Sequence, residues 1–386
     1  MVSEASERGT HMARRGAESR LATKLLPTDA RAHNRTLVIQ TVLRSRDVSR
    51  ADVARITGLS RITVSELVAG LVSDGIIVET GSRATAGRPG KPATLLAINP
   101  DVFTTVAVDL SQPGEFHGSL LTLDGSEIRH AVVDGNARGD GAVAQVLGLV
   151  AQLAESTTIP IGGIGIGTPG IVDDSGVVLE STNLGWRRLA LADVVRERFS
   201  VPTRVENDAN AAIVSELDSQ HSDDLLLVRV GAGLGGAAFV GGQLVRGASF
   251  AAGEFAHVRT PPAADGSATV EESVQSLLRM ADRLRDQLPD RPEAAALLEA
   301  TQRQIGALIG QTLTPAVAML DVPRVIIDGP RELDVAIIAE AAQTAIRNQR
   351  SLVSGRLCAV MPGVNGPDAV LLGMSGIVRS LAIAAL

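Results

Sequence analysis

The spacing of apolar residues changes near residue 100 and divides the chain into two parts. Before this point, Val64, Leu67, Val68, Leu71 and Val72 occupy positions i, i+3, i+4, i+7 and i+8, which predicts one buried stripe on a helix. After it, short apolar runs alternate with longer stretches of helical spacing, which is typical of an α/β domain. The pattern therefore predicts a small helical unit followed by a larger α/β unit.

The first part carries signals for the start and the end of its helices. One helix is predicted over 34–44, and the next begins at Ser49, whose hydroxyl can accept hydrogen bonds from the free amides of the first turn. Gly58 supplies the turn that follows, and Ser60 caps the third helix. We therefore expect two short helices joined by a tight turn, with a further helix before them.

The two later helices resemble a helix-turn-helix motif. Ala54, Gly58 and Val64 stand at the spacing at which such motifs place a small residue, a turn glycine and a buried aliphatic residue. Apolar runs at 76–79 and 94–98 predict a hairpin behind them, with a long tip that can serve as a wing. The first part is therefore predicted to be a winged helix-turn-helix domain.

The residues predicted to contact DNA are polar or basic, and they lie at helix caps, on the outer face of the third helix or at the hairpin tip. They are Ser49, Ser60, Arg61, Thr63, Ser65, Arg88 and Lys91. The basic residues of the tip can lie against phosphates or enter a minor groove. Other interpretations stay open: a three-helix protein-interaction domain with solvated charges, a merely solvated Arg88, or ordinary surface roles for Thr63 and Ser65.

Charge is distributed unevenly along the chain. The net charge is −7, yet residues 1–100 carry 15 Lys and Arg against 9 Asp and Glu, a net charge of +6, and the remainder carries 21 against 34, a net charge of −13. Attraction to the phosphates of double-stranded DNA is therefore expected only of the first part. Recognition of single strands by base stacking is not expected, because the chain has no Tyr, one Trp and six Phe.

The second part is predicted to be an α/β fold. Strands are predicted over 103–110, 119–123, 127–133, 161–166, 204–206, 225–230, 236–240 and 324–328. Helices are predicted over 142–155, from 208, across 269–319 and over 332–349. A short segment at 370–372 is predicted before a last helix over 375–386. Two strand-rich halves meet near residue 210, which points to a duplicated architecture.

The predicted domains are a polar arm over 1–30, a DNA-binding domain over 31–99, and an effector and oligomerisation domain over 100–386. Within the last domain, lobe one is predicted at about 100–207 plus 373–386, and lobe two at about 208–372.

Cysteine content and hydropathy exclude several classes of protein. Cys358 is the only cysteine, so no disulfide can form within the chain and no site that needs several thiolate ligands is expected. No uninterrupted run of roughly 20 apolar residues predicts a membrane span, and Arg14 and Arg15 precede polar residues rather than the apolar core of a signal peptide. We expect a cytoplasmic protein without a membrane partner, a metal or another cofactor.

Five ordered blocks carry a family resemblance. They lie at 165–173, 183–186, 206–210, 231–242 and 253–257. These blocks resemble those of the ROK family of repressors, open reading frames and sugar kinases, and the winged unit before them makes the whole chain similar to a ROK-type transcriptional regulator. The resemblance implies an actin-like ATPase fold of two α/β lobes with a sugar bound in the cleft, and a homodimer or homotetramer.

The resemblance also implies which residues bind the effector. They are Gly170, Asn183, Asn207, Asp208, Glu254, His257 and Glu272. Each sugar hydroxyl both donates and accepts hydrogen bonds, so carboxylates, amides and an imidazole suit it. In the kinases of the family, the residue that matches Asp208 is the general base. Asp208 could instead be only a helix cap and His257 a structural histidine, and Trp186 is interpreted as a core or hinge residue.

Departures from the family pattern favour a regulator over a kinase. The kinases carry Asp-x-Gly-x-Thr where ATP phosphates approach the backbone, whereas this chain has Asp-Leu-Ser-Gln-Pro at 109–113, and it also departs at Ala232 and at Gly329-Pro330. Residues 258–276 lack the family's zinc-binding cysteines. We expect a repressor of carbohydrate metabolism genes controlled by a sugar or sugar phosphate, and not an enzyme. An ATP-dependent sugar kinase with an accessory DNA-binding domain is the alternative, and a vestigial pocket in a dimerisation scaffold is a third possibility.

Overall fold

The structure is a computed structural model that describes residues 27–45, 47–83, 92–217, 224–231, 233–259, 268–287, 292–349 and 358–386. The chain divides into two compact units, Met1–Ile98 and Asn99–Leu386. This division falls where the spacing of apolar residues changes, because each unit buries its own set of apolar side chains.

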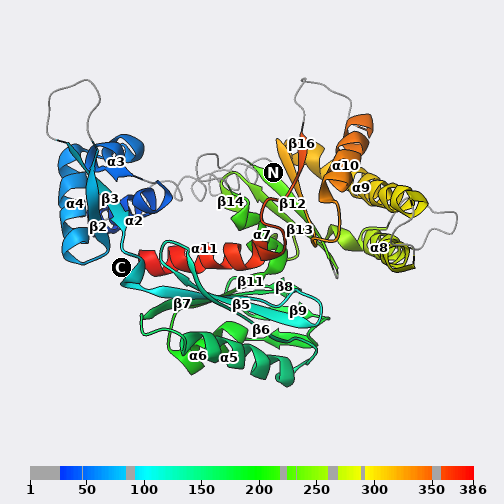
Figure 1. Ribbon diagram of the computed structural model, residues 1–386, viewed down its shortest axis with the longest axis horizontal. Coiled ribbons are helices and arrows are strands. Elements are labelled where there is room, and N and C mark those ends of the chain that lie inside the picture. The colour runs from blue at the N-terminus through cyan, green and yellow to red at the C-terminus, as the bar shows by residue number, and fades with distance from the viewer. Residues whose placement is uncertain are drawn as a thin grey trace, which may run out of the picture. The chain divides into compact units, whose positions relative to one another are not determined.

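The first unit combines three helices with a small antiparallel sheet (Figure 1). The helices are α2 (Pro27–Arg44), α3 (Arg50–Thr57) and α4 (Arg61–Ser73), and the strands are β1 (Val48–Ser49), β2 (Ile77–Arg83) and β3 (Ala93–Ile98) in the order β1-β3-β2. The two long strands form the predicted hairpin, with Ile77 opposite Ile98. Its tip at 84–91, which includes Arg88 and Lys91, lies outside the described residues.

Local caps fix the turn between α3 and α4. Ser49 and Asp52 form a capping box, in which the Asp52 amide donates to Ser49 Oγ at 3.3 Å and the Ser49 amide donates to the Asp52 carboxylate at 3.1 Å. Gly58 ends α3 at φ 72°, in the left-handed region that glycine adopts without strain. Ser60 then caps α4 by accepting from the Thr63 amide at 3.1 Å. These caps confirm the predicted helix-turn-helix.

Three details of the first unit differ from the prediction. α2 begins at Pro27 rather than at residue 34, because its first turns are polar and carry no apolar stripe that periodicity could reveal; residues 27–30 therefore belong to this helix and not to the arm. Val72 is 36% exposed, so the buried stripe of α4 ends at Leu71. β1 was not predicted, since two residues are too few to show alternation.

The second unit contains two five-stranded sheets of identical connectivity (Figure 1). The first has the order β11-β7-β4-β5-β6 and consists of β4 (Thr104–Asp109), β5 (Glu115–Thr122), β6 (Glu127–Asp134), β7 (Ile161–Thr168) and β11 (Thr203–Asn207). The second has the order β14-β13-β12-β15-β16 and consists of β12 (Leu225–Val230), β13 (Leu234–Val240), β14 (Gln243–Leu244), β15 (Arg324–Asp328) and β16 (Ala359–Pro362). In each sheet, an antiparallel meander is extended by two strands parallel to its first strand. The topology confirms the predicted duplication, and each sheet is the centre of one lobe.

Helices cover both faces of each sheet. α5 (Asp140–Ala154) and α6 (Leu191–Phe199) pack on the outer face of the first sheet, and α8 (Val270–Gln287), α9 (Pro292–Leu320) and α10 (Val335–Gln349) on the outer face of the second.

A small sheet of β8 (Ile171–Val172), β9 (Val178–Ser181) and β10 (Trp186–Leu189) follows β7. Short 3-10 turns lie at Pro100–Val102, Phe255–His257 and Gly366–Asp368. Trp186 is buried and donates from Nε1 to the Gly139 carbonyl at 2.9 Å, which confirms it as a core residue.

Two helices, α7 (Asp208–Ser215) and α11 (Ala369–Ala384), join the lobes between their inner faces. They approach closely at Gly373, where a Cβ would lie 1.8 Å from the Ala211 carbonyl oxygen. Gly163, Gly165 and Gly167 of β7 leave the space that side chains of α11 fill on the first sheet. Both lobes are therefore packed against one shared pair of helices.

The apolar character of α11 follows from this packing. Its segment Gly366–Ala384 is long and apolar enough to cross a membrane by length and composition only, and half of it is buried inside the structure. Asp368 and Arg379 interrupt it, so it is not the uninterrupted apolar run whose absence the sequence analysis noted. Residues 370–372, predicted as a separate segment, belong to this helix. The side chains of Val370 and Leu371 face the core between the lobes, whereas Leu372 is 42% exposed.

Candidate functional site

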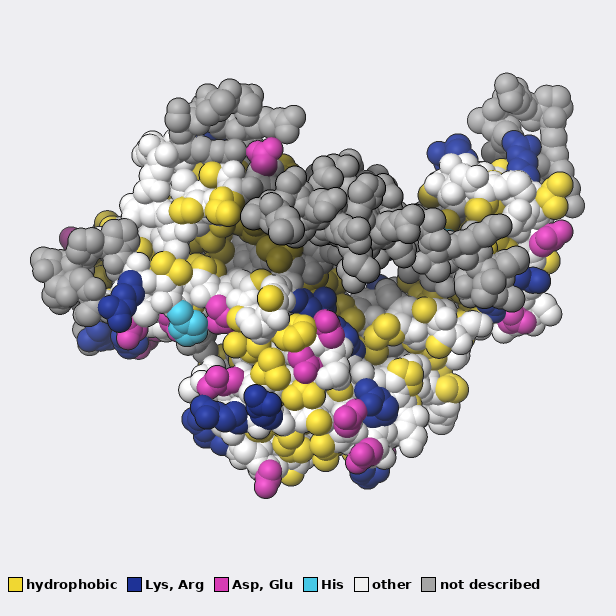
Figure 2. Space-filling model, turned by 180° about the vertical axis from the view of Figure 1, so that it is seen from behind, with side chains coloured by type: hydrophobic (Ala, Val, Ile, Leu, Met, Phe, Trp, Pro, Cys, Tyr) yellow, Lys and Arg dark blue, Asp and Glu magenta, His cyan; other side chains and the backbone are white. Residues whose placement is uncertain are grey.

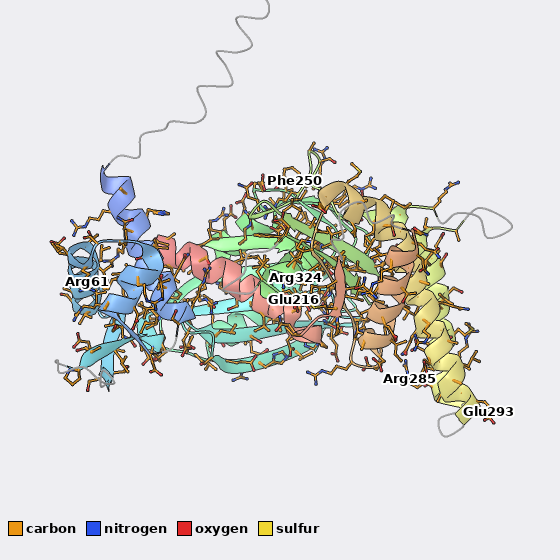
Figure 3. The ribbon with its side chains drawn as sticks, turned by 90° about the horizontal axis from the view of Figure 1, so that it is seen from above. Arg61, Glu216, Phe250, Arg285, Glu293 and Arg324 are labelled. Carbon is orange, nitrogen blue, oxygen red and sulfur yellow. The ribbon has the colours of Figure 1, made fainter. Side chains whose placement is uncertain are left out.

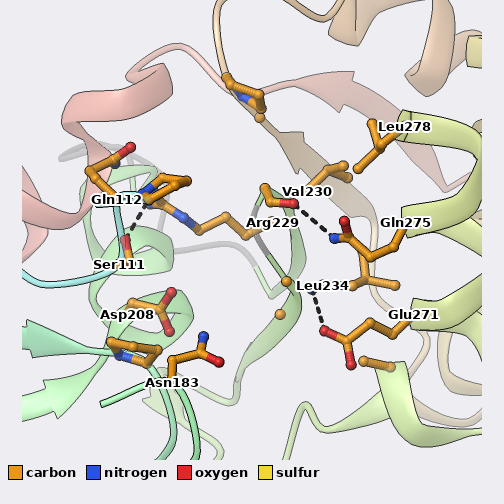
Figure 4. A pocket seen from close by; sticks show the side chains of 18 of the residues that line it. Ser111, Gln112, Asn183, Asp208, Arg229, Val230, Leu234, Glu271, Gln275 and Leu278 are labelled. Atoms are coloured by element: carbon orange, nitrogen blue, oxygen red, sulfur yellow. Dashed lines mark hydrogen bonds between the residues drawn. The ribbon is translucent and has the colours of Figure 1, made fainter. Parts of the chain in front are cut away.

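A polar cavity of about 690 Å³ opens between the two lobes of the second unit (Figure 4). One wall comes from the carboxyl ends of β4, β7, β9 and β11, and the other from β12, β13, α8 and the segment after β15. Because the ends of parallel strands meet at this edge of each sheet, short loops from distant parts of the chain bring their polar residues together here. The volume suits a small-molecule ligand.

Six of the seven predicted effector-binding residues line this cavity. They are Gly170, Asn183, Asn207, Asp208, Glu254 and His257. In Figure 4, Asn183 and Asp208 lie on the same wall of the cavity. The sugar-binding role of these residues stays a prediction, whereas their convergence on one cavity is a feature of the fold.

The amide of Asn207 organises one corner of the cavity. Its Nδ2 donates to the Gly170 carbonyl at 2.9 Å and to Asp208 Oδ1 at 3.1 Å, while its Oδ1 accepts from the Asn210 amide at 3.0 Å and so caps α7. Gly170 has φ 108°, and a Cβ there would lie 2.2 Å from the Glu180 carbonyl oxygen, so this close approach requires glycine. Asn207 rather than Asp208 is the helix cap, which leaves the Asp208 carboxylate for the cavity.

Burial, with a smaller effect of the nearby Asp109 carboxylate, raises the pKa of Asp208 to about 6 against the opposing influence of the Arg229 guanidinium. Asp208 is half-buried, and its side chain faces the cavity (Figure 4). Burial likewise raises the pKa of Asp328 to about 6, again against the influence of Arg229. Asp208 on the cavity wall and Asp328 behind it are therefore poorly solvated carboxylates in need of hydrogen-bond donors.

These two carboxyl groups predict how the stability of the ligand-free protein depends on pH. Their pKa values are near 6 in the folded chain and near 3.8 in the reference state, so the folded chain takes up protons first as the pH falls. Stability should therefore rise between pH 7.5 and pH 5, by about 2 kcal/mol in total, and Tm measured by differential scanning fluorimetry should rise with it. The variants Asp208→Asn and Asp328→Asn should each lose part of this gain, and a flat or falling Tm in the wild-type protein would contradict the assignment.

Arg229, which the sequence analysis did not single out, lies on the cavity wall between the lobes. Its side chain is 13% exposed, its Nη1 lies 3.6 Å from Asp328 Oδ2, and its Nη2 donates to Ser111 Oγ at 3.5 Å (Figure 4). Ser111 in turn donates from its amide and hydroxyl to Asp109, and Gln112 donates to the same carboxylate at 3.0 Å. Side chains therefore fill the loop after β4, where the sequence departs from the kinase pattern.

The glycine-rich loop between β12 and β13 is tied to α8 on the opposite side of the cavity. Gln275 donates to the Gly231 carbonyl at 2.9 Å, and Glu271 accepts from the Leu234 amide at 3.3 Å (Figure 4). The position of Ala232 lies outside the described residues. Two backbone groups of the loop thus have partners within the chain.

Glu271, and not the predicted Glu272, reaches the cavity. The Thr269 amide and hydroxyl donate to the Glu272 carboxylate at 2.7 and 3.1 Å, which holds the pKa of Glu272 below its usual range. Glu272 is therefore the acidic member of a capping box at the start of α8, turned away from the cavity. The Thr-x-x-Glu spacing of this box was a signal that could have identified it.

Glu254 and His257 form the outer part of the cavity. They come from the turn Phe255–His257 and its preceding residue, and His257 Nε2 lies 3.3 Å from Glu254 Oε2. The His257 side chain is 69% exposed, so it is not a buried structural histidine. Among the described residues, no group of three or more His, Cys, Asp and Glu side chains is arranged to hold a metal ion.

The predicted DNA-contacting residues of the first unit divide into two groups. Ser49, Ser60 and Thr63 use their hydroxyls in caps, where Ser60 Oγ and Thr63 Oγ1 also share a hydrogen bond of 2.8 Å. Arg61, which is labelled in Figure 3, and Ser65 are exposed on α4. Fewer polar side chains of this helix are therefore available for DNA contacts than the sequence predicted.

Comparison with solved structures defines the class of fold. The structure resembles that of a ROK family transcriptional regulator, a homologue of the E. coli MLC protein, with a TM-score of 0.73 at 20% identity over 92% of this chain and 97% of that one. It also resembles a ROK family glucokinase from Streptomyces griseus in complex with glucose and AMPPNP, with a TM-score of 0.60 at 26% identity over 72% of this chain and 99% of that one. The second unit has the two-lobed, actin-like architecture of the sugar kinases, and a winged helix-turn-helix unit precedes it.

Sequence comparison finds a family match within the second unit. The ROK family profile matches residues 139–277. The chain is 32% identical over 235 residues to the xylose repressor of Caldicellulosiruptor bescii, and the match covers 58% of each chain. It therefore spans less than two thirds of the length of this relative.

Proposed function

We propose that this chain is a sequence-specific DNA-binding transcriptional regulator of carbohydrate metabolism genes, whose affinity for its operator is controlled by a sugar bound in the cavity. The first unit binds double-stranded DNA, and the second binds the effector and assembles into a homodimer or homotetramer in the cytoplasm. One observation carries the proposal: a winged helix-turn-helix unit stands in the same chain as a ROK domain with a polar cavity. The similarity to a xylose repressor supports it.

The charges around the cavity favour an uncharged sugar over a sugar phosphate. Five acidic side chains line it, Asp208, Glu254, Glu271, Asp282 and Glu332, against the three arginines Arg229, Arg279 and Arg285. Asp109 and Asp328 lie directly behind and are buried. An added phosphate dianion would face this excess of carboxylates, of which Asp208 is poorly solvated, whereas neutral hydroxyls can donate to them. We therefore narrow the effector class to neutral sugars, of which xylose is one.

We further propose that the chain does not catalyse phosphoryl transfer. The loop after β4 is filled by Ser111 and Gln112, and Arg229 contacts it from the opposite lobe. Phosphoryl transfer depends on positioning and on stabilisation of phosphate charge, both of which such a loop impairs. A coupled ADP-release assay with ATP and a panel of hexoses and pentoses should show no turnover. Turnover that Asp208→Asn abolishes would instead support the ATP-dependent sugar kinase.

A mobility-shift experiment tests the proposed regulator. The full chain is incubated at low salt with the DNA upstream of its own gene, alone and with D-xylose, D-glucose or glucose 6-phosphate. We expect a specific shift that competes poorly with unrelated DNA, and a change in that shift with a neutral sugar but not with the sugar phosphate. Absence of any shift at low salt would contradict DNA binding, and a response to the phosphate alone would contradict the charge argument.

A further inference from the structure

The exposed face of α4 carries one large apolar side chain that the fold does not use. The buried stripe of this helix consists of Val64, Leu67, Val68 and Leu71. Ile62, in the first turn, is 74% exposed, the largest exposed fraction among the large apolar side chains described in the first unit. Because Ile62 lies outside the core, removal of its side chain should leave the stability of the unit unchanged. We therefore looked for a function of Ile62 outside the fold.

The polar side chains of the same turn are engaged elsewhere. Ser60 Oγ accepts from the Thr63 amide at 3.1 Å and shares a hydrogen bond with Thr63 Oγ1 at 2.8 Å. These hydroxyls fix the start of the helix and have little freedom to turn toward a base edge. The outward side chains of the first two turns are then Arg61, Ile62 and Ser65, with Glu66 beside them.

The surroundings of Ile62 fit a small apolar target better than a protein partner. Protein interfaces bury contiguous apolar patches, whereas Ile62 is flanked by the exposed polar residues Arg61, Ser65 and Glu66. The second helix of a helix-turn-helix motif enters the major groove with its N-terminal residues against the bases. In that groove, the 5-methyl group of thymine is the only apolar group on a base edge.

We propose that Ile62 recognises a thymine of the operator by contact with its 5-methyl group. This inference rests on the proposed DNA-binding function and deepens it by assigning one base preference to one residue. Arg61, adjacent in the chain, then remains for phosphate or guanine contacts, which need a cation rather than an apolar surface. The contact is worth roughly one buried methyl group, so its loss should weaken binding about 4-fold.

Deoxyuridine lacks only the 5-methyl group, so it provides a direct test. The upstream DNA fragment is amplified with dTTP or with dUTP, and the affinity of the full chain for both products is measured by fluorescence anisotropy at one salt concentration. The wild-type protein should bind the thymine fragment about 4-fold or more tightly than the uracil fragment. Ile62→Ala should bind both fragments alike, near the affinity of the wild-type protein for uracil DNA, and Ile62→Val should retain a preference.

A matched control variant and the binding of the wild-type protein to both fragments distinguish the possible outcomes. Ile56 of α3 is 50% exposed, and Ile56→Ala should keep the full preference for thymine. Equal affinity of the wild-type protein for both fragments, or an undiminished preference in Ile62→Ala, would overturn the role of Ile62 while leaving DNA binding intact. A wild-type protein that binds neither fragment would refute the proposed function itself, and this inference with it.

Discussion

Asp208→Asn should weaken sugar binding by about 10- to 100-fold, because hydrogen bonds to a charged acceptor contribute about 1.5–3 kcal/mol each. Asp208 faces the cavity, and Asn207 Nδ2 donates to its Oδ1, so the second oxygen is the natural acceptor for a ligand hydroxyl. The amide can accept with only one atom, and it presents a donor where the carboxylate presented an acceptor. The measurement is isothermal titration calorimetry with the sugar that gives the largest thermal shift.

A control with the same chemical change lies away from the cavity. Asp193→Asn on α6 replaces an exposed carboxylate that pairs with Arg196, and it should leave sugar affinity unchanged. DNA binding without sugar should persist in both variants, since neither lies in the first unit. Wild-type sugar affinity in Asp208→Asn would remove Asp208 from the binding site.

Arg246→Met should destabilise the second unit by about 3 kcal/mol, with a fall in Tm of about 6–10 °C. Glu206 at the end of β11 is 1% exposed, and its carboxylate pairs with Arg246 from the segment after β14. Asn210 Nδ2 also donates to Glu206 at 3.1 Å, and Arg204 lies 3.4 Å away. Loss of Arg246 leaves a buried carboxylate with one partial counter-ion, and it removes an ion pair that joins the two sheets next to the cavity.

An exposed ion pair provides the comparison for this effect. Arg303→Met removes pairs with Glu299 and Glu340 on the surface, where ion pairs contribute about 0–1 kcal/mol. The double variant Arg246→Met, Glu206→Gln should recover part of the lost stability, because the buried charge is then absent. Equal Tm values for Arg246→Met and Arg303→Met in thermal unfolding would contradict the importance of the buried pair.

The parts of the fold that sequence predicted best are those set by local signals. α4 begins where predicted, and β12 has both predicted bounds, because a turn glycine with a cap and a continuous apolar run mark these positions within a few residues. β16 and β8 to β10 were missed, since they are short and form only where a neighbouring strand is already present. Tertiary context, rather than propensity, decides such elements.

In the candidate site, too, the residues that belong to local sequence blocks were predicted, whereas a residue defined by distant contacts was not. The six residues that line the cavity as predicted belong to recognisable blocks, and the resemblance located them without any knowledge of geometry. Arg229 could not be found in this way, because its partners Asp109, Asp208 and Asp328 are far from it in sequence. A lone arginine in an apolar strand carries no motif of its own.

Charged side chains of both signs are mixed on the face of the second unit that Figure 2 shows. On the face of the second unit in Figure 2, acidic and basic side chains are interspersed over the lobe built around the first sheet, without a patch of one sign. Such a surface offers no continuous attraction for a phosphate backbone. The net charge of −13 after residue 100 is a separate reason to regard the first unit as the part suited to DNA.

The central claim is that sugar in the cavity changes the affinity of the chain for DNA. The direct measurement is the Kd for the upstream DNA fragment, by fluorescence anisotropy at fixed salt, with and without a saturating amount of the sugar that calorimetry identifies. Coupled sites typically change each other's affinity by about 5- to 150-fold. We predict a change of at least about 5-fold in the wild-type protein, and a smaller one in Asp208→Asn at the same sugar concentration because that variant binds the sugar more weakly. A sugar that binds with measurable heat while the Kd for DNA stays the same would contradict the account.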